Sequence, residues 1–223
     1  MASVNIFETL RARVEKSGGL LPQERRAMFW FSQYSAALTS WQGSNRDIKF
    51  RTVENELPSQ MMVGPQRAFP GYMYFFQYEP VGIHTLPAYD AFPLTLVIKR
   101  ETTGFLGLNF HYLSYRSRAM LFDVLYKSLI ALGPDPDGSG PLGPDPLKTR
   151  MRATYKLLDG MSKYKAFRPC LKRYRFSQCR TPLLQVGSSE WDLALFLPVE
   201  QFRKSTKADV WQESLESIQE RKR

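Results

Sequence analysis

His84 and His111, the two histidines of the chain, are candidate catalytic bases, because a hydrolytic nucleophile is activated by a histidine, a lysine or a terminal amine. His84 precedes LPAYD in a predicted turn, where a surface role or a hydrogen bond is expected. His111 lies in GLNFHYL, and strand alternation places it with Asn109 on the less apolar face. We expect a structural or contact role for His111, with its ring hydrogen-bonded to a neighbouring loop.

One carboxylate constellation could hold Mg²⁺ for a nuclease: Glu79, Asp90 and Glu101, with Lys99 nearby. Spacing alone does not bring these groups together, because AYDAFP is a predicted turn and Glu101 begins a hairpin loop. The phosphate-binding pattern GxxxxGK[ST] is absent, and the match to GxGxxG, GSGPLG at 138–143, lies in the predicted Pro/Gly linker loop rather than between a strand and a helix. The sequence therefore favours a protein that is not an enzyme, with no cofactor and no metal site.

The two cysteines, Cys170 and Cys179, lie nine residues apart with no second pair and no nearby histidine. Cysteine and histidine alone therefore cannot supply four zinc ligands. Reduced, inert thiols are expected, and a disulfide is the alternative.

The net charge of +10 is confined to one part of the chain. Residues 148–180 contain 11 of the 31 Lys and Arg residues but one of the 21 acidic residues, so the remainder balances. Such a local surplus indicates a polyanionic partner: nucleic acid first, then an acidic protein surface or membrane headgroups. The predicted phosphate contacts are Lys148, Arg150, Arg152, Lys156, Lys163, Lys165, Arg168, Lys172, Arg173, Arg175 and Arg180.

Three strand-like runs follow one another closely: YMYFFQY, PLTLVIKR and GFLGLNFHYL. Short connections favour antiparallel neighbours, because parallel strands need long crossovers. In the third run Leu106, Leu108, Phe110 and Tyr112 alternate on one face. The predicted fold is α+β, a small antiparallel sheet or partly open β-barrel decorated by N- and C-terminal helices.

Helix signals flank the predicted sheet. Ser114 is a predicted N-cap, and Thr206 with Asp209 forms a capping box before a helix with an apolar stripe of Trp211, Leu215 and Ile218. A basic helix is predicted over 146–160. Its Arg152 and Lys156 share a face.

The predicted organisation has five parts. They are N-terminal helices (1–41), a connecting arm (42–71), a β-rich core with a following helix (72–132), a Pro/Gly linker loop (133–147), and the basic segment with C-terminal helices packing on the core (148–223). No apolar run reaches 18 residues and the N-terminus lacks the order of a secretory signal, so a soluble protein made in a cytoplasm, without a membrane partner, is expected.

Aromatic residues interleave with cations in KYKAFRPCLKRYRFSQCR, at Tyr164, Phe167, Tyr174 and Phe176. This pattern suits phosphate contacts combined with base stacking at single-stranded ends. It equally suits a core strand whose basic residues point outward. The sequence leaves both interpretations open.

Several segments carry a family resemblance: FPGYMYFFQYEP, LPAYDAFPLTLVI, GFLGLNFHYL, YKAFRPCLKRY and EWDLALFLPVEQFRKSTKADVW. In these, over about residues 68 to 213, the chain resembles a family of structural proteins of T4-like bacteriophages, the DNA end protectors. The resemblance implies a non-enzymatic virion protein that binds the ends of packaged double-stranded DNA, shields them from exonuclease and takes part in head completion with other phage proteins. The alternative is a baseplate or neck subunit of the phage tail that binds neighbouring proteins without contacting DNA.

Overall fold

The computed structural model describes residues 29, 31–36, 38, 62–115, 117–118, 121, 165–186 and 201–220. The predicted arm up to residue 61, the linker 133–147 and the basic helix 146–160 lie outside these residues. The five-part division of the chain therefore stays a prediction. No helix in the described part of the chain is long and apolar enough to cross a membrane.

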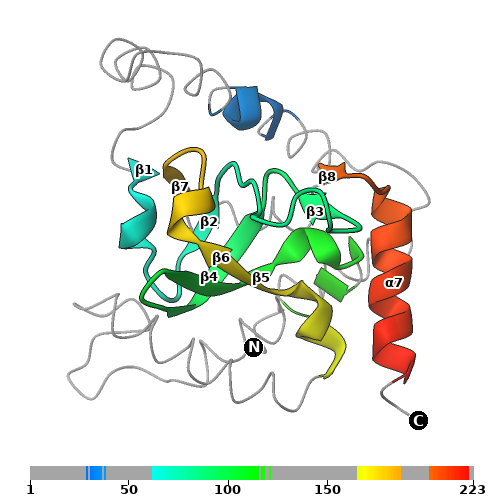
Figure 1. Ribbon diagram of the computed structural model, residues 1–223. Coiled ribbons are helices and arrows are strands. Elements are labelled where there is room, and N and C mark those ends of the chain that lie inside the picture. Colours follow the sequence, from blue (N-terminus) through cyan, green and yellow to red (C-terminus); the bar gives the residue numbers. More distant parts are fainter. Residues whose placement is uncertain are drawn as a thin grey trace, which may run out of the picture.

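An open sheet of antiparallel strand pairs forms the centre of the molecule (Figure 1). The six strands lie in the order β1-β7-β2-β4-β5-β6, so β1 and β6 are its edges and the sheet does not close into a barrel. The α+β class is confirmed, as an open sheet. The strands of this sheet are β1 Met62–Val63, β2 Met73–Phe75, β4 Leu94–Arg100, β5 Gly104–Asn109, β6 Leu171–Arg175 and β7 Leu183–Val186. A second, two-stranded sheet pairs β3, Tyr89–Asp90, with β8, Phe202–Arg203.

The three predicted strand runs become β2, β4 and β5, which are antiparallel neighbours as expected. The third strand ends earlier than its alternation predicts. The Asn109 side-chain oxygen accepts a hydrogen bond from the backbone N–H of His111 at 2.9 Å, and Phe110–Tyr112 then forms a 3-10 turn, η3. The prediction that Phe110, His111 and Tyr112 continue the strand alternation is therefore wrong, because a side-chain cap competes with the strand ladder.

Both faces of the sheet are buried, each against a different cluster. Leu96, Ile98 and Leu108 belong to the larger hydrophobic cluster, which also contains Phe31 of the helical residues 31–36. On the other face, Val97 and Phe105 belong to a smaller, aromatic cluster. The alternation of strand side chains between two faces explains why neighbours such as Val97 and Ile98 enter different cores.

The C-terminal helix α7, Lys207–Glu220, begins with the predicted capping box. The Thr206 hydroxyl oxygen accepts from the Asp209 N–H at 3.3 Å, and the Asp209 carboxylate accepts from the Thr206 N–H at 3.2 Å. The predicted apolar stripe is wrong at Leu215, and the side chain of its third member, Ile218, lies outside the described residues. Leu215 is 43% exposed, whereas Val210 and Ser214, four residues apart, are buried and Trp211 is half-buried. The buried face of α7 thus contains Val210 and Ser214, each one residue before the predicted Trp211 and Leu215.

Gly104 allows the backbone of β6 to approach β5 closely. A Cβ atom at this position would overlap the carbonyl oxygen of Tyr174, a backbone atom that cannot move without breaking the β5–β6 pairing. We expect Gly104→Ala to lower the free energy of unfolding by at least about 2 kcal/mol, measured by urea denaturation.

Gly64→Ala is the matched control. Gly64 has φ −61°, and the nearest atom to an added Cβ is at an ordinary contact distance of 3.5 Å. The control should change stability by less than about 0.5 kcal/mol. Equal losses in the two variants would show that the β5–β6 contact is not the cause.

Candidate nucleic-acid interface

The structure describes the side chains of five of the eleven predicted phosphate contacts. Arg168, Arg173, Arg175 and Arg180 are exposed, and Lys172 is half-buried. Only the backbone of Lys165 is described, as part of the 3-10 turn η4, Lys165–Cys170. The other five, Lys148, Arg150, Arg152, Lys156 and Lys163, lie outside the described residues.

Strand β6 brings two of the exposed arginines together at the edge of the sheet. Tyr174 is 4% exposed and packs in the aromatic cluster, at 5.2 Å from the Phe105 ring centroid. Since side chains alternate along a strand, Arg173 and Arg175 on either side of Tyr174 point the opposite way. Phe167, in η4, is also buried. For Phe167 and Tyr174 the core interpretation is confirmed, so neither ring is available to stack on a base.

The predicted cations differ in their electrostatic surroundings. Arg173 Nε lies 3.0 Å from the Glu101 carboxylate, and Arg180 Nε lies 2.6 Å from the Glu79 carboxylate. The Lys172 ammonium lies 3.7 Å from the centroid of the Tyr112 ring, and burial lowers the pKa of Lys172. The Lys172 side chain is thus half-buried against Tyr112, whereas the side chains of Arg173 and Arg180 are exposed to solvent.

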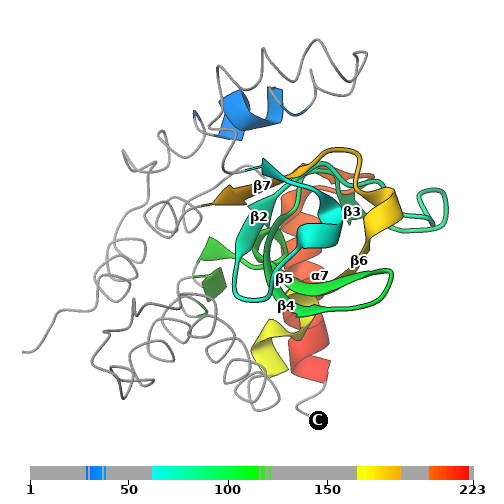
Figure 2. The same cartoon turned by 90° about the vertical axis from the view of Figure 1, so that its left-hand side faces the viewer.

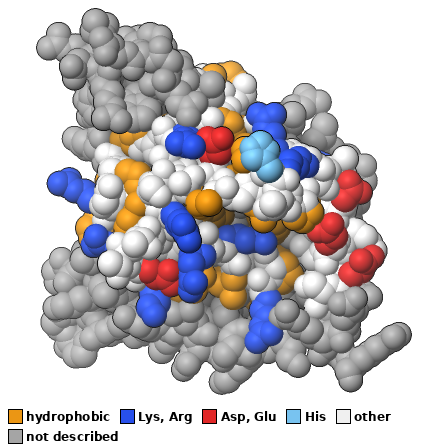
Figure 3. Space-filling model, in the orientation of Figure 1, with side chains coloured by type: hydrophobic (Ala, Val, Ile, Leu, Met, Phe, Trp, Pro, Cys, Tyr) orange, Lys and Arg blue, Asp and Glu red, His pale blue; other side chains and the backbone are white. Residues whose placement is uncertain are grey.

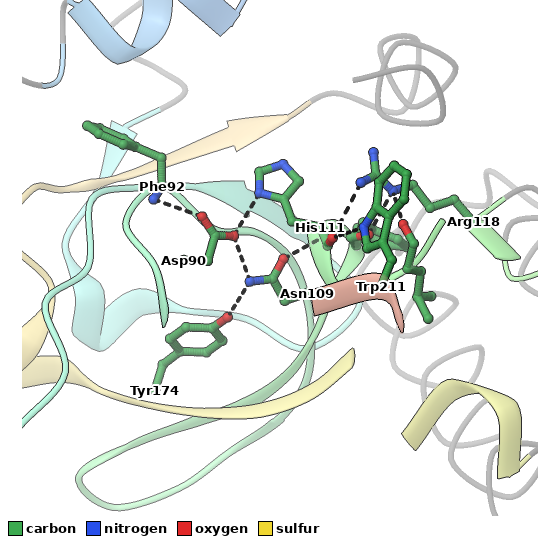
Figure 4. Close-up of polar contacts among 9 residues, drawn as sticks. Asp90, Phe92, Asn109, His111, Arg118, Tyr174 and Trp211 are labelled. Carbon is green, nitrogen blue, oxygen red and sulfur yellow. Dashed lines mark hydrogen bonds and ion pairs between the residues drawn. The ribbon is translucent and has the colours of Figure 1, made fainter. Parts of the chain in front are cut away.

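A buried carboxylate holds the elements around β6 together (Figure 4). Asp90 Oδ2 accepts from Asn109 Nδ2 at 2.9 Å and from His111 Nδ1 at 2.7 Å, and Asp90 Oδ1 accepts from the Phe92 N–H at 3.1 Å. Asn109 Nδ2 also donates to the Tyr174 hydroxyl at 3.0 Å. One network therefore links β3, β5, η3 and β6, and buried polar groups need such partners.

The predicted structural role of His111 is confirmed. Its ring is fully buried, and because a carboxylate oxygen only accepts, Nδ1 carries the proton that it donates to Asp90. Its Nε2 is also buried, with no hydrogen-bond partner among the described residues. His84 lies in the predicted turn and is exposed, and its backbone oxygen accepts from Lys204 Nζ at 3.0 Å.

The carboxylates considered for a nuclease are not brought together. Asp90 is buried in the network, while Glu79 and Glu101 each pair with a different surface arginine. The described residues contain no group of three or more His, Cys, Asp or Glu side chains that could hold a metal ion.

Both cysteines are free thiols, as expected. Cys170 is fully buried, and burial raises the pKa of its thiol. Burial also raises the pKa of the Cys179 thiol to about 12. Both groups stay protonated near neutral pH, which makes them poor nucleophiles.

Arg118 is a buried residue that the sequence did not reveal. Its Nε donates to the carbonyl oxygens of Phe110 and Leu113, both at 2.8 Å, and so supports the 3-10 turn that carries His111. Its guanidinium also lies 5.7 Å from the Trp211 ring centroid, and Trp211 Nε1 donates to the His111 carbonyl oxygen at 2.9 Å. Arginine is rarely buried, so no sequence pattern marked this position.

Charge is distributed unevenly over the face shown in Figure 3. Blue Lys and Arg side chains gather over the sheet, whereas red side chains gather along α7 at the right. Among the described side chains of that helix, the exposed acidic ones are Asp209, Glu213 and Glu216. A polyanion would therefore meet a favourable potential over the sheet and an unfavourable one at α7.

Comparison with known proteins gives one match. A family model described as phage T4 terminal DNA protecting protein matches residues 40–214. No curated protein and no solved structure matches the chain.

The Asp90 network generates a stability prediction. In Asp90→Asn an amide of the same size replaces an oxygen acceptor with an N–H₂ donor, which would face the donors of Asn109, His111 or Phe92. We expect the free energy of unfolding to fall by about 2 to 3 kcal/mol, measured by urea denaturation.

Tyr174→Phe provides the control, since it removes one hydroxyl from the same network and should cost about 1 kcal/mol. A loss in Asp90→Asn no greater than that in Tyr174→Phe would contradict a central role for the carboxylate.

Proposed function

The chain belongs to the family of the phage T4 terminal DNA protecting protein, and from this membership we propose that it binds the ends of packaged double-stranded phage DNA and protects them from exonuclease. In this proposal the protein is a virion component that acts by binding rather than catalysis. It takes part in head completion and contacts other phage structural proteins.

The family match carries the proposal, because it spans residues 40–214 and so includes the whole six-stranded sheet and the basic segment 148–180. The exposed arginines on β6 support it. Arginine suits phosphate recognition, because its planar guanidinium offers several donors to phosphate oxygens.

Protection requires no chemistry from the protein. An exonuclease must engage a free terminus, so a protein that remains bound there blocks it sterically. Affinity for a polyanion comes largely from cations that neutralise phosphates and release counterions. Phosphate contacts carry no sequence information, which suits binding to a DNA end of any sequence.

The basic segment should determine the salt dependence of DNA binding. Each phosphate contact contributes about 0.9 to the slope of log affinity against log salt concentration. We therefore expect a flatter slope and weaker binding when four predicted contacts are reversed together, as titrated with linear duplex over a series of salt concentrations. The variant combines Arg152→Glu, Lys156→Glu, Arg173→Glu and Arg175→Glu.

Single reversals provide a matched pair for that experiment. Arg175→Glu on β6 and Arg203→Glu on β8 both replace an exposed strand arginine and change the charge equally. The slope should flatten for Arg175→Glu and stay unchanged for Arg203→Glu. Unchanged binding in the fourfold variant would contradict the assignment of the basic segment.

End binding itself is tested by DNA topology. The protein should retard linear duplex but not closed circular duplex, and should slow exonuclease digestion of the linear form. Equal retardation of the linear and the circular duplex would contradict end protection. Retardation of neither form would also contradict it, and would favour a tail or neck subunit that binds proteins.

A further inference from the structure

A Pro-Gly turn places one aromatic ring at an end of the large sheet. Residues 69–72 read Phe-Pro-Gly-Tyr, the Tyr72 N–H donates to the Phe69 carbonyl oxygen at 3.3 Å, and Gly71 has φ 84°. Proline second and a left-handed glycine third are the residues that a type II turn requires. The Phe69 N–H also donates to the Tyr74 hydroxyl at 3.3 Å. Two hydrogen bonds and proline thus hold the backbone of Phe69, while its side chain is 42% exposed.

The turn lies at the end of the sheet where β4 finishes. Strands β2 and β4 are antiparallel, so β2 begins where β4 ends. The Gly71 N–H donates to the Val97 carbonyl oxygen at 2.8 Å, which fixes the turn against the last part of β4. The exposed Lys99 and Arg100 complete that strand.

The β4–β5 hairpin joins the end of β6 to the same surface. Lys99 and Arg173 both pair with Leu106, from opposite sides, and Gly104 pairs with Arg175. The Phe176 N–H donates to the Thr103 carbonyl oxygen at 3.0 Å, which ties β6 to the hairpin tip. Figure 2 shows this end facing the viewer, with the 3-10 turn η2, Pro65–Arg67, the β4–β5 hairpin and the 3-10 turn η5, Phe176–Gln178, grouped around it.

We call this end of the molecule the sheet-end surface: Arg67, Phe69, Lys99, Arg100, Arg173 and Arg175. All six residues are exposed. Glu101, at the hairpin tip, is the carboxylate that pairs with one of them, Arg173. From β2 to β6 the surface spans three strand spacings, about 14 Å. It combines a planar apolar ring with cations at the same end of the sheet.

Two other exposed apolar side chains, Val81 and Leu215, lack this combination. Val81 is aliphatic and lies in the turn around His84. Leu215 lies on α7 beside the exposed carboxylate of Glu216, which would repel phosphate. A duplex end presents a flat aromatic base pair bordered by phosphates of both strands, so a flat ring bordered by cations is complementary to it.

We infer that the sheet-end surface receives the terminal base pair of duplex DNA, with Phe69 stacking on the base pair while Arg67, Lys99, Arg100, Arg173 and Arg175 contact the last phosphates. The inference rests on the proposed function and gives it a mechanism for distinguishing an end from the interior of a duplex. Glu101 competes with phosphate for Arg173 in the free protein.

Two DNA probes test the stacking contact: a short blunt-ended duplex and the same duplex closed at both ends by hairpin loops. Phe69→Ala should weaken binding to the blunt duplex at least about fivefold, because stacking of one base on an aromatic ring contributes about 1 to 3 kcal/mol. Binding to the closed duplex should not change. Phe69→Trp should retain the preference for the blunt duplex, and Val81→Ala, which truncates a more exposed apolar side chain elsewhere, should behave as wild type.

Charge variants test the phosphate contacts on the same probes. Lys99→Gln with Arg100→Gln should weaken binding and flatten the salt slope, whereas Arg203→Gln should not. Glu101→Gln should strengthen binding, because it releases Arg173 and removes a negative charge. Urea denaturation of each variant checks that the fold is intact.

The outcomes separate this inference from the proposed function. If wild-type protein prefers the blunt duplex and Phe69→Ala keeps that preference, the sheet-end assignment is wrong while end protection stands. Equal weakening of both probes by Phe69→Ala also overturns stacking on the terminal pair. If wild-type protein does not distinguish the probes, both proposals fail.

Discussion

The arrangement of this protein depends on the carboxylate of Asp90, which is almost completely buried. Burying a charge is costly unless hydrogen bonds replace water, and Asp90 accepts N–H groups from Phe92, Asn109 and His111. Phe92 follows β3 directly, whereas Asn109 and His111 lie at the end of β5 and in η3, 19 and 21 residues along the chain from Asp90. The carboxylate can therefore be buried only when β3, β5 and η3 are all in place, which couples these local elements into one cooperative structure.

That coupling extends to the surface through Tyr174. The Asn109 amide donates to the Tyr174 hydroxyl, which keeps the ring inside and directs the adjacent Arg173 and Arg175 outward from an edge strand. Charged residues on an edge strand also discourage pairing with another sheet. The same cations thus protect an exposed edge and, in the proposed function, also supply positive potential for DNA binding.

The described residues contain no group of three or more His, Cys, Asp or Glu side chains that could hold a metal ion. Two thiols with raised pKa and a histidine whose ring is buried do not offer the exposed, activated groups of an active site. Acidic residues along α7 make the electrostatic potential there unfavourable for a polyanion.

Local patterns were enough to predict the antiparallel neighbours β2, β4 and β5, the Thr206–Asp209 cap and the family, because short connections, caps and ordered segments are properties of sequence neighbours. They failed where distant residues decide. Strand β5 ends early because the Asn109 side chain caps the next turn. Helix α7 buries Val210 rather than Leu215, and the Arg118 side chain is buried because it donates to the backbone carbonyl oxygens of η3 and Leu113. The sequence by itself determined that the excess charge lies in residues 148–180. Only the tertiary structure brought Lys99, Arg100 and Phe69 to the same end of the sheet as Arg173, since strand pairing joins residues remote along the chain.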